Sequence, residues 1–306
     1  MRLLKPQLVL GRGVRMDLEV LLIDLLNGVS RSMVYFLMAS GLTVAFSVMG
    51  IVNFAHGSLV MLGAYIMWSL LHYTGVTWPF LAFLVVTGIT VGIVGGMIEK
   101  FILRKIYGAD QLYQLLLTFI LILIIDGLVL EIWGGSPLSM KLPTYLTGGV
   151  TIISRPFPKY FLFTPLCSAC IAILFWLFLY KTNSGKVSRA TAMDKEITST
   201  FGINVTYVYF VMFAIGGALA GFSGGLGLAM ACLSPGIGAN IVVICFAIIV
   251  IGGMGSLGGT FTASLILGVF EAFGDHYFPK LAMALPYILM SFILIIRPQG
   301  LFGAKQ

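Results

Sequence analysis

Long apolar stretches separated by short polar ones run along nearly the whole chain. They lie at 20–39, 41–51, 57–73, 79–98, 112–133, 161–180, 206–232, 239–254, 258–274 and 280–296. Because a membrane-crossing helix needs about 20 apolar residues, the pattern predicts an all-α polytopic membrane protein with about eight transmembrane helices. The segments 41–51 and 239–254 are shorter and contain glycine. We expect broken or re-entrant backbone at both.

The composition agrees with a chain that is dissolved in lipid. Of its 306 residues, 59% are hydrophobic and only 9% are charged, whereas a soluble domain carries about 25% charged residues. Its mean hydropathy is +1.05. Since no long polar stretch could hold a soluble domain, we expect a single transmembrane domain over residues 1–306.

Lysine and arginine gather in a few short segments, and these predict the orientation. The loop 99–110, the loop 181–204 and the C-terminus are all basic. Basic loops are retained in the cytoplasm, so we expect these three inside, together with the basic tail 1–17. The side of the tail depends on 41–51, because the tail would lie outside if that segment is not a crossing. The net charge of +7 therefore reflects topology and does not indicate a nucleic-acid-binding surface.

The order of the segments suggests an internal repeat. A full span, a short glycine-broken piece and two more spans occur both at 20–98 and at 206–296. Broken segments at matching positions of two halves often mark the pathway of a transporter. The residue identities of the two halves barely match, so a true repeat and a chance similarity of pattern both stay open.

Two interrupted stretches are candidates for the pathway or its gate. Their residues are Asn53, Phe54, Ala55, His56, Gly57, Gly252, Gly253, Met254, Gly255 and Ser256. Polar groups inside a membrane tend to face a bundle interior or a watery path. The alternative is that Asn53 caps a helix and Gly57 closes a turn. The second stretch has no lysine and no GxxxxGK[ST] motif, so it does not indicate a nucleotide site.

Other intramembrane features favour structural interpretations. Gly217, Gly221 and Gly225 recur every four residues, which leaves one helix face open for close packing. Cys167 and Cys170 form a CxxC without nearby ligands, so we interpret them as packed thiols and expect no metal site. Arg31 and Asp126 lie inside spans, and pairs of Arg31 with Asp126 or with Asp24 are both conceivable.

The loop 181–204 is the longest strongly polar stretch on the predicted cytoplasmic side. Ser and Thr precede helix-compatible runs, and Gly202 offers a C-terminal stop. This pattern predicts one or two brief helices at the membrane surface. An ordinary solvated loop and a docking element for a soluble partner both stay open.

Several of these stretches together carry a resemblance that covers about residues 21–303. They are the run 50–57 followed by Met61-Leu62-Gly63-Ala64-Tyr65, then Tyr107-Gly108-Ala109-Asp110, Leu116-Leu117-Thr118-Phe119, Arg189-Ala190…Asp194…Gly202-Ile203-Asn204, Gly252-Gly253-Met254-Gly255-Ser256 and Arg297-Pro298-Gln299-Gly300-Leu301-Phe302-Gly303. In this order and spacing the chain resembles the LivH-type permease family of branched-chain amino acid ABC importers.

The resemblance implies a permease subunit of the bacterial inner membrane that works by alternating access. It implies four kinds of partner: the lipid bilayer, a second related permease, two ATPase subunits and a periplasmic solute-binding protein. ATP would be used by the partners, and this chain would bind no cofactor and catalyse no reaction. The cargo would be branched-chain amino acids or related small polar solutes such as urea, short amides and carboxylates. The residues expected at the ATPase contact are Arg189, Ala190, Asp194, Gly202, Ile203 and Asn204.

Departures and alternatives remain. Arg31 stands where the family usually shows a small or apolar residue, and Ile120 follows Thr118-Phe119 where glycine is common. A stand-alone channel or ion-coupled secondary transporter is the alternative function. A membrane enzyme would need clustered His, Asp or Glu, whereas the three histidines are scattered along the chain.

Overall fold

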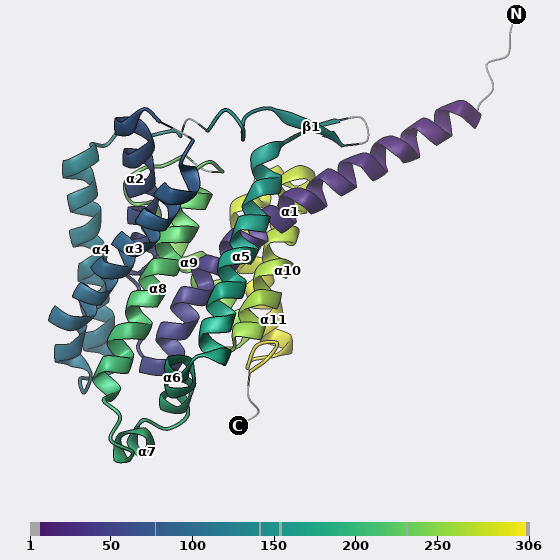
Figure 1. The fold of residues 1–306 in the computed structure, drawn as a ribbon. Coiled ribbons are helices and arrows are strands. Elements are labelled where there is room, and N and C mark those ends of the chain that lie inside the picture. Colours follow the sequence, from purple (N-terminus) through teal and green to yellow (C-terminus); the bar gives the residue numbers. More distant parts are fainter. Residues whose placement is uncertain (1–6, 77, 141, 153–154, 231, 304–306) are drawn as a thin grey trace, which may run out of the picture.

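The computed structural model describes residues 7–76, 78–140, 142–152, 155–230 and 232–303 (Figure 1). The α-helices are α1 (Gln7–Met49), α2 (His56–Thr74), α3 (Phe80–Phe101), α4 (Gln111–Trp133), α5 (Lys159–Lys181), α6 (Asn183–Met193), α7 (Lys195–Thr200), α8 (Val205–Gly227), α9 (Ile237–Gly252), α10 (Leu257–Tyr277) and α11 (Leu285–Ile296). Two 3-10 helices, η1 (Leu103–Ile106) and η2 (Pro279–Ala284), and the antiparallel strands β1 (Gly149–Ile152) and β2 (Arg155–Pro158) complete the described elements. The sequence analysis did not predict the strands.

The fold is the helical bundle that the apolar pattern predicts. Among the described residues, seven helices are long and apolar enough to cross a bilayer, and α9 is a shorter apolar helix of 16 residues. Helices suit lipid because each satisfies its own backbone hydrogen bonds. The outer surface matches, since large apolar side chains such as Leu116, Leu123 and Ile173 are more than half exposed there. The prediction of an all-α polytopic membrane protein is confirmed.

Helix α8 lies in the centre of the bundle and has two glycine faces. On the face toward α3, a Cβ built on Gly221 would lie 3.0 Å from the Cα of Gly88, and one on Gly217 would lie 3.4 Å from that of Gly92. Gly225 lies on the same face, against Leu84. Since these distances leave no room for larger side chains, α3 and α8 approach almost backbone to backbone.

The opposite face of α8 packs against α1 and α2. A Cβ built on Gly216 would lie 2.8 Å from the carbonyl oxygen of Gly41, and one on Gly224 would lie 2.9 Å from the backbone nitrogen of Ala64. The sequence analysis identified only the glycines that face α3, because it followed the four-residue spacing from Gly217. Gly216 and Gly224 lie on the second face, and each directly precedes a glycine of the first face in the sequence.

The packing of helices relates the two halves of the chain. Helix α3 packs along α8, as α10 packs along α1, while α1 crosses α8 and α2 meets α9. Exchanging α1–α2–α3 with α8–α9–α10 therefore maps the main helix pairs onto each other. The crossing point of α1 and α8 is reciprocal, because Gly41 and Gly216 each face the other's carbonyl oxygen. The structure therefore supports a repeat, but in another register than the predicted one, which matched 41–51 with 239–254 and 79–98 with 280–296. Because 41–51 belongs to α1, helix α2 corresponds to α9 and α3 corresponds to α10.

The breaks in the helices fall close to the predicted places, with one correction. Helix α1 continues without interruption to Met49, so 41–51 is not a separate short segment. Gly41 is a packing residue within the helix, and the break comes at Gly50, which has a φ of 69°. A positive φ ends a right-handed helix and is readily adopted by glycine. At the other site α9 is short, as expected for 239–254.

The basic loops lie together at one end of the bundle. The η1 region, the α6–α7 pair and the segment after α11 are all at the lower end in Figure 1. This arrangement agrees with the prediction that these three regions share one side.

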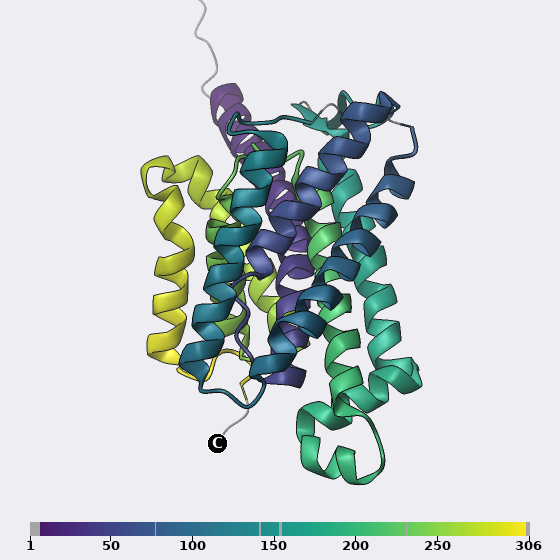
Figure 2. The ribbon, with the colours of Figure 1, turned by 90° about the vertical axis from the view of Figure 1, so that its left-hand side faces the viewer.

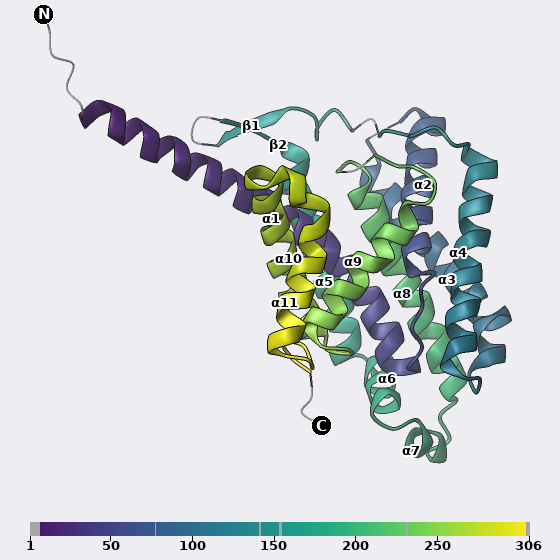
Figure 3. The same ribbon diagram turned by 180° about the vertical axis from the view of Figure 1, so that it is seen from behind.

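The N-terminal part of α1 departs from that prediction. Residues 1–6 of the predicted tail lie outside the described residues, while residues 7–17 continue α1. Helix α1 has 43 residues, so it is about 65 Å long at 1.5 Å per residue. Its first turns emerge at the end opposite α6 and α7 (Figures 1, 2 and 3). Residues 7–17 and the loop 181–204 therefore lie on opposite sides of the bundle, which is the alternative for a chain in which 41–51 is not a separate crossing.

Candidate translocation site

The segment between α1 and α2 is buried, non-helical backbone. Asn53 is 2% exposed, and its Oδ1 accepts a hydrogen bond from the backbone N–H of Ala55 at 3.0 Å. Its carbonyl oxygen accepts one from the N–H of His56 at 3.3 Å. Asn53 thus closes the turn that starts α2, although Ala55 occupies the N-cap position. Phe54 packs its ring against that of Phe246 on α9.

His56 shows how far this segment returns into the bundle. Its Nε2 donates a hydrogen bond of 2.9 Å to the carbonyl oxygen of Met38, and the side chain is 2% exposed. Met38 lies 11 residues before Met49, the last residue of α1, which corresponds to about 16 Å along a helix axis. Helix α2 therefore begins deep inside the bundle and not at its surface, so 50–55 is re-entrant.

Helices α2 and α9 meet at their first turns. A Cβ built on Gly57 would collide with the carbonyl oxygen of Gly238 and would lie 2.7 Å from the backbone nitrogen of Val242. One built on Gly238 would lie 2.9 Å from the Cα of Ser58. Gly57 does not close a turn, as one interpretation proposed. Its lack of a side chain lets two broken helices start against each other.

The second predicted stretch lies elsewhere, at the turn from α9 to α10. Gly253 and Gly255 have φ values of 97° and 84°, and Ser256 caps α10 by accepting a hydrogen bond from the N–H of Gly259 at 3.0 Å. Gly252 packs against Gly259, while Met254 is 65% exposed. The segment after α11 closes over this turn, because the N–H of Phe302 donates to the carbonyl of Gly252 at 3.0 Å. The structure does not bring 252–256 together with 53–57.

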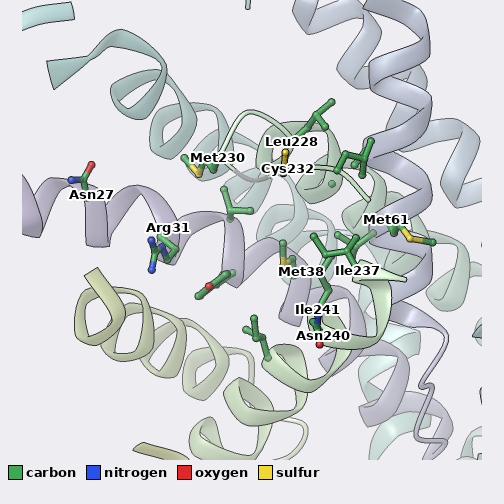
Figure 4. Close-up of a pocket in the computed structure, with 18 of the residues that line it drawn as sticks. Asn27, Arg31, Met38, Met61, Leu228, Met230, Cys232, Ile237, Asn240 and Ile241 are labelled. Carbon is green, nitrogen blue, oxygen red and sulfur yellow. The ribbon is translucent and has the colours of Figure 1, made fainter. Parts of the chain in front are cut away.

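A cavity of about 760 Å³ lies between α1, α2, α8, α9 and α10 (Figure 4). Figure 4 shows Arg31 of α1 toward one end of its lining and Met61 of α2 toward the other. The cavity lies in the half of the bundle away from α6 and α7, where α1 enters and α10 ends. None of the ten predicted pathway residues lines it. Their role as pathway or gate stays a prediction.

The charged part of the cavity is built from two facing helices. The Nη1 of Arg31 lies 2.8 Å from Oδ2 of Asp275 and 3.3 Å from Oε2 of Glu271. Tyr35 also donates a hydrogen bond of 2.7 Å to Glu271. The sequence analysis considered Asp126 and Asp24 as conceivable partners of Arg31, but the structure pairs it with Asp275 and Glu271. Arg31 and Tyr35 share one face of α1, which packs against α10.

Asp126 lies apart from the cavity. It accepts a hydrogen bond from the hydroxyl of Ser58 at 3.3 Å and belongs to α4. Ser58 is in the first turn of α2, so this carboxylate is close to the place where α2 and α9 meet. The contact ties α4 to the start of a broken helix.

The predicted ATPase-contact residues form an exposed protrusion at the opposite end of the bundle from the cavity. The loop 181–204 folds into α6 and α7, two brief helices as predicted. Asp194 caps α7, accepting hydrogen bonds of 2.9 Å from the N–H groups of Glu196 and Ile197. Asn204 caps α8 by accepting one from Tyr207 at 3.1 Å, after Gly202 has ended α7 with a φ of 78°.

The remaining members of this set lie beside these caps. Arg189 places its guanidinium 4.5 Å from the ring centre of Tyr180, at the end of α5. Ala190 is exposed on α6, and Ile203 is half-buried. The six residues therefore share one region, and their capping contacts fix the shape of the protrusion.

Comparison with known proteins decides the family. A sequence model described as branched-chain amino acid transport system / permease component matches residues 24–294. The chain belongs to this family. A relative from Pseudomonas aeruginosa, the high-affinity branched-chain amino acid transport system permease protein BraD, is 28% identical over 92% of this chain and 96% of its own length. LivH of Escherichia coli K12 is 27% identical over 92% and 96% of the two chains.

Two further comparisons give one more relative and one solved structure. A probable LivH permease from the archaeon Methanocaldococcus jannaschii is 27% identical, covering 87% of this chain and 88% of its own. Among solved structures, PsaBC from Streptococcus pneumoniae in complex with Fab gives a TM-score of 0.46 and 14% identity, over 88% and 89% of the two chains. This branched-chain amino acid permease family member is a multi-pass inner-membrane protein, with seven apolar helices in its described part.

Two residues of this permease's charged cluster escaped the sequence analysis. Asp275 lines the cavity, and Glu271, one helical turn before it, is 5% exposed and pairs with Arg31 behind the lining, yet both lie within or just after an apolar segment. Acids spaced four apart on one helix share a face. That spacing, read beside Arg31 and Tyr35 at the same spacing, was the available signal.

Proposed function

We propose that this chain is the permease subunit of an ATP-driven importer for branched-chain amino acids or closely related solutes. The supporting observation is the family match over 24–294, which spans the whole bundle. Two relatives, BraD and LivH, are permease proteins of branched-chain amino acid transport systems. Movement of solute would follow from alternating access, in which the helices around the non-helical segment 50–55 and the start of α9 open to one side at a time.

The energy would enter through the α6–α7 protrusion. The sequence of this chain has no GxxxxGK[ST] motif, so ATP would be hydrolysed by partner subunits. Two short, capped helices on the basic, cytoplasmic end give a rigid surface on which such subunits can push. The proposed partners are two ATPases on this end, a second related permease in the membrane, and a solute-binding protein on the other end.

Co-purification followed by reconstitution tests this proposal. The chain is extracted in mild detergent from its native membrane, and the co-purifying proteins are identified. The complex is then placed in liposomes, and uptake of radiolabelled leucine is measured with and without ATP and binding protein. We expect a second permease, ATPases and ATP-dependent uptake. Recovery of the chain alone, with uptake that needs no ATP, would support a channel or ion-coupled carrier instead.

A further inference from the structure

The cavity between α1, α2, α9 and α10 has two chemically different ends. One end is lined by Asp24, Arg31, Asp275 and His276. The other is mostly apolar, with Asn240 beside Ile241 as a polar residue (Figure 4). Its apolar lining residues are Met38, Val60, Met61, Ile237, Ile241 and Ile244. A volume of about 760 Å³ falls in the range of about 300–1,000 Å³ that is typical of small-molecule sites. Such a shape suits a small molecule with a charged head and a hydrocarbon tail.

The charged end carries more negative than positive charge. Arg31 is the partner of both Glu271 and Asp275, at 3.3 Å and 2.8 Å. Asp24 is a third carboxylate, and the Nδ1 of His276 lies 3.6 Å from its Oδ2. That distance is too long for a hydrogen bond. Among the described residues, Arg31 pairs with Glu271 and Asp275 but not with Asp24, so a further cation at Asp24 would complete the cluster.

Asp24 is the residue that points to a ligand. It is 6% exposed, and its Oδ2 has no hydrogen-bond partner within the protein. A buried charged oxygen without a donor is costly. Since Asp24 lines the cavity, a donor can reach it from there. A protonated amine supplies both the N–H group and the positive charge, in a charge-assisted hydrogen bond.

We propose that this cavity binds the imported amino acid directly, with its ammonium group at Asp24 and its aliphatic side chain against Met61, Ile237 and Ile241. This inference rests on the proposed function and adds that the permease itself selects cargo by its amine. Selection by the amine would let the permease distinguish amino acids from urea, short amides and simple carboxylates. None of these carries a protonated amine, and so none would supply the missing cation.

Direct binding to the assembled transporter tests the proposal. The complete complex, without its binding protein, is placed in nanodiscs, and binding of radiolabelled leucine is measured by scintillation proximity. Asp24→Asn keeps the shape of the side chain but removes its charge, and we expect leucine to bind about tenfold more weakly, equivalent to about 1.4 kcal/mol. Binding of 4-methylpentanoate, which has the same tail without the amine, should be equally weak in both proteins.

Asp126→Asn is the matched control, because it removes an intramembrane carboxylate outside the cavity. It should leave leucine binding unchanged. Ile241→Phe provides a second test if Asp24→Asn does not assemble. The larger side chain fills the apolar end, so leucine binding should fall several-fold while alanine binding changes less.

Two outcomes would overturn the proposal. Equal leucine binding by the wild type and Asp24→Asn would remove the ammonium contact, and equal losses for leucine and alanine in Ile241→Phe would remove the apolar contact. Reconstituted ATP-dependent leucine uptake by the wild type separates this inference from the proposed function. If uptake occurs but the variants behave like the wild type, only the inference fails. If no uptake occurs in the wild type, the proposed function fails first.

Discussion

Gly57 of α2 and Gly238 of α9 touch through their backbones at the first turn of each helix. This contact joins a broken helix from one half of the chain to its counterpart in the other half. Neither position tolerates a side chain in the described geometry, because the space that a Cβ would occupy already holds backbone atoms of the partner helix.

Replacing Gly57 with alanine should therefore destabilise the bundle. Overpacking of this kind costs about 1–3 kcal/mol, and here the clash is with backbone that cannot rotate away. We expect a lower melting temperature of the purified protein, followed by size-exclusion chromatography after heating. Gly127→Ala is the matched control, since nothing lies within 4 Å of a Cβ at that helical position. Equal melting of both variants would contradict the close contact.

The packing of α8 on α3 makes a second prediction. Gly221→Leu places a large side chain where Gly88 and Val91 leave about 3 Å. We expect low expression and a reduced melting temperature, because α3 and α8 would be forced apart. Gly127→Leu changes another helical glycine with open surroundings and should express normally. Normal expression of Gly221→Leu would show that the two helices do not need this close approach.

The cap on α7 allows two roles of Asp194 to be separated. Asp194→Ala removes the oxygen that accepts from Glu196 and Ile197, at a cost of about 1 kcal/mol to the start of the helix. We expect weaker stimulation of ATPase activity by cargo-loaded binding protein, with membrane insertion intact. Asp194→Ser keeps a capping oxygen and should retain most of the stimulation.

Comparing these two variants shows whether Asp194 acts as a helix cap or by contacting a partner directly. If both lose stimulation equally, the carboxylate itself meets a partner, and capping is secondary. If neither loses it, the assignment of Asp194 to ATPase coupling is wrong.

Tyr107 predicts a dependence of stability on alkaline pH. Burial, and then its hydrogen bond to the fully buried Glu99, raise the pKa of the Tyr107 hydroxyl above its usual value. The folded state thus holds this proton more tightly than the unfolded chain does. Its contribution is complete below about pH 10, the usual tyrosine pKa, and is lost as the pH rises above it.

Melting temperatures measured from pH 8 to pH 11 check this sign. Tyr107→Phe should lower the melting temperature at pH 8, because Glu99 loses a donor. It should also show a smaller further decrease between pH 9.5 and pH 11 than the wild type. Parallel curves for the two proteins would show that Tyr107 does not contribute to the alkaline decrease.

The sequence predicted the helices because a segment that crosses lipid as a helix needs about 20 apolar residues. The same rule placed α9 as a short helix and located the break near Gly50 to within a few residues. The pattern could not show that Gly41 packs within a continuous helix, since a packing glycine and a breaking glycine look alike. Only the neighbouring backbone distinguishes them.

The hydrophobic pattern could not predict which side chains on distant helices contact each other. Arg31 and Glu271 are 240 residues apart, and their pairing depends on how α1 and α10 lie against each other. The contacts of the proposed ATPase-contact residues could not be predicted for a different reason. The helix starts here carry residues that favour N-caps, namely Thr182, Asp194 and Asn204, but the proposed contact would be with other chains, which one sequence does not describe.

The junction of α2 and α9 has an electrostatic consequence. Each helix carries about half a positive elementary charge at its N-terminus, so two such ends meeting at Gly57 and Gly238 place roughly one unit of positive charge inside the bundle. The Asp126 side chain, held by Ser58 in the first turn of α2, lies beside this junction. A carboxylate at this point can offset the two helix dipoles, so helix α4 supplies the charge that lets two helix N-termini meet within the membrane.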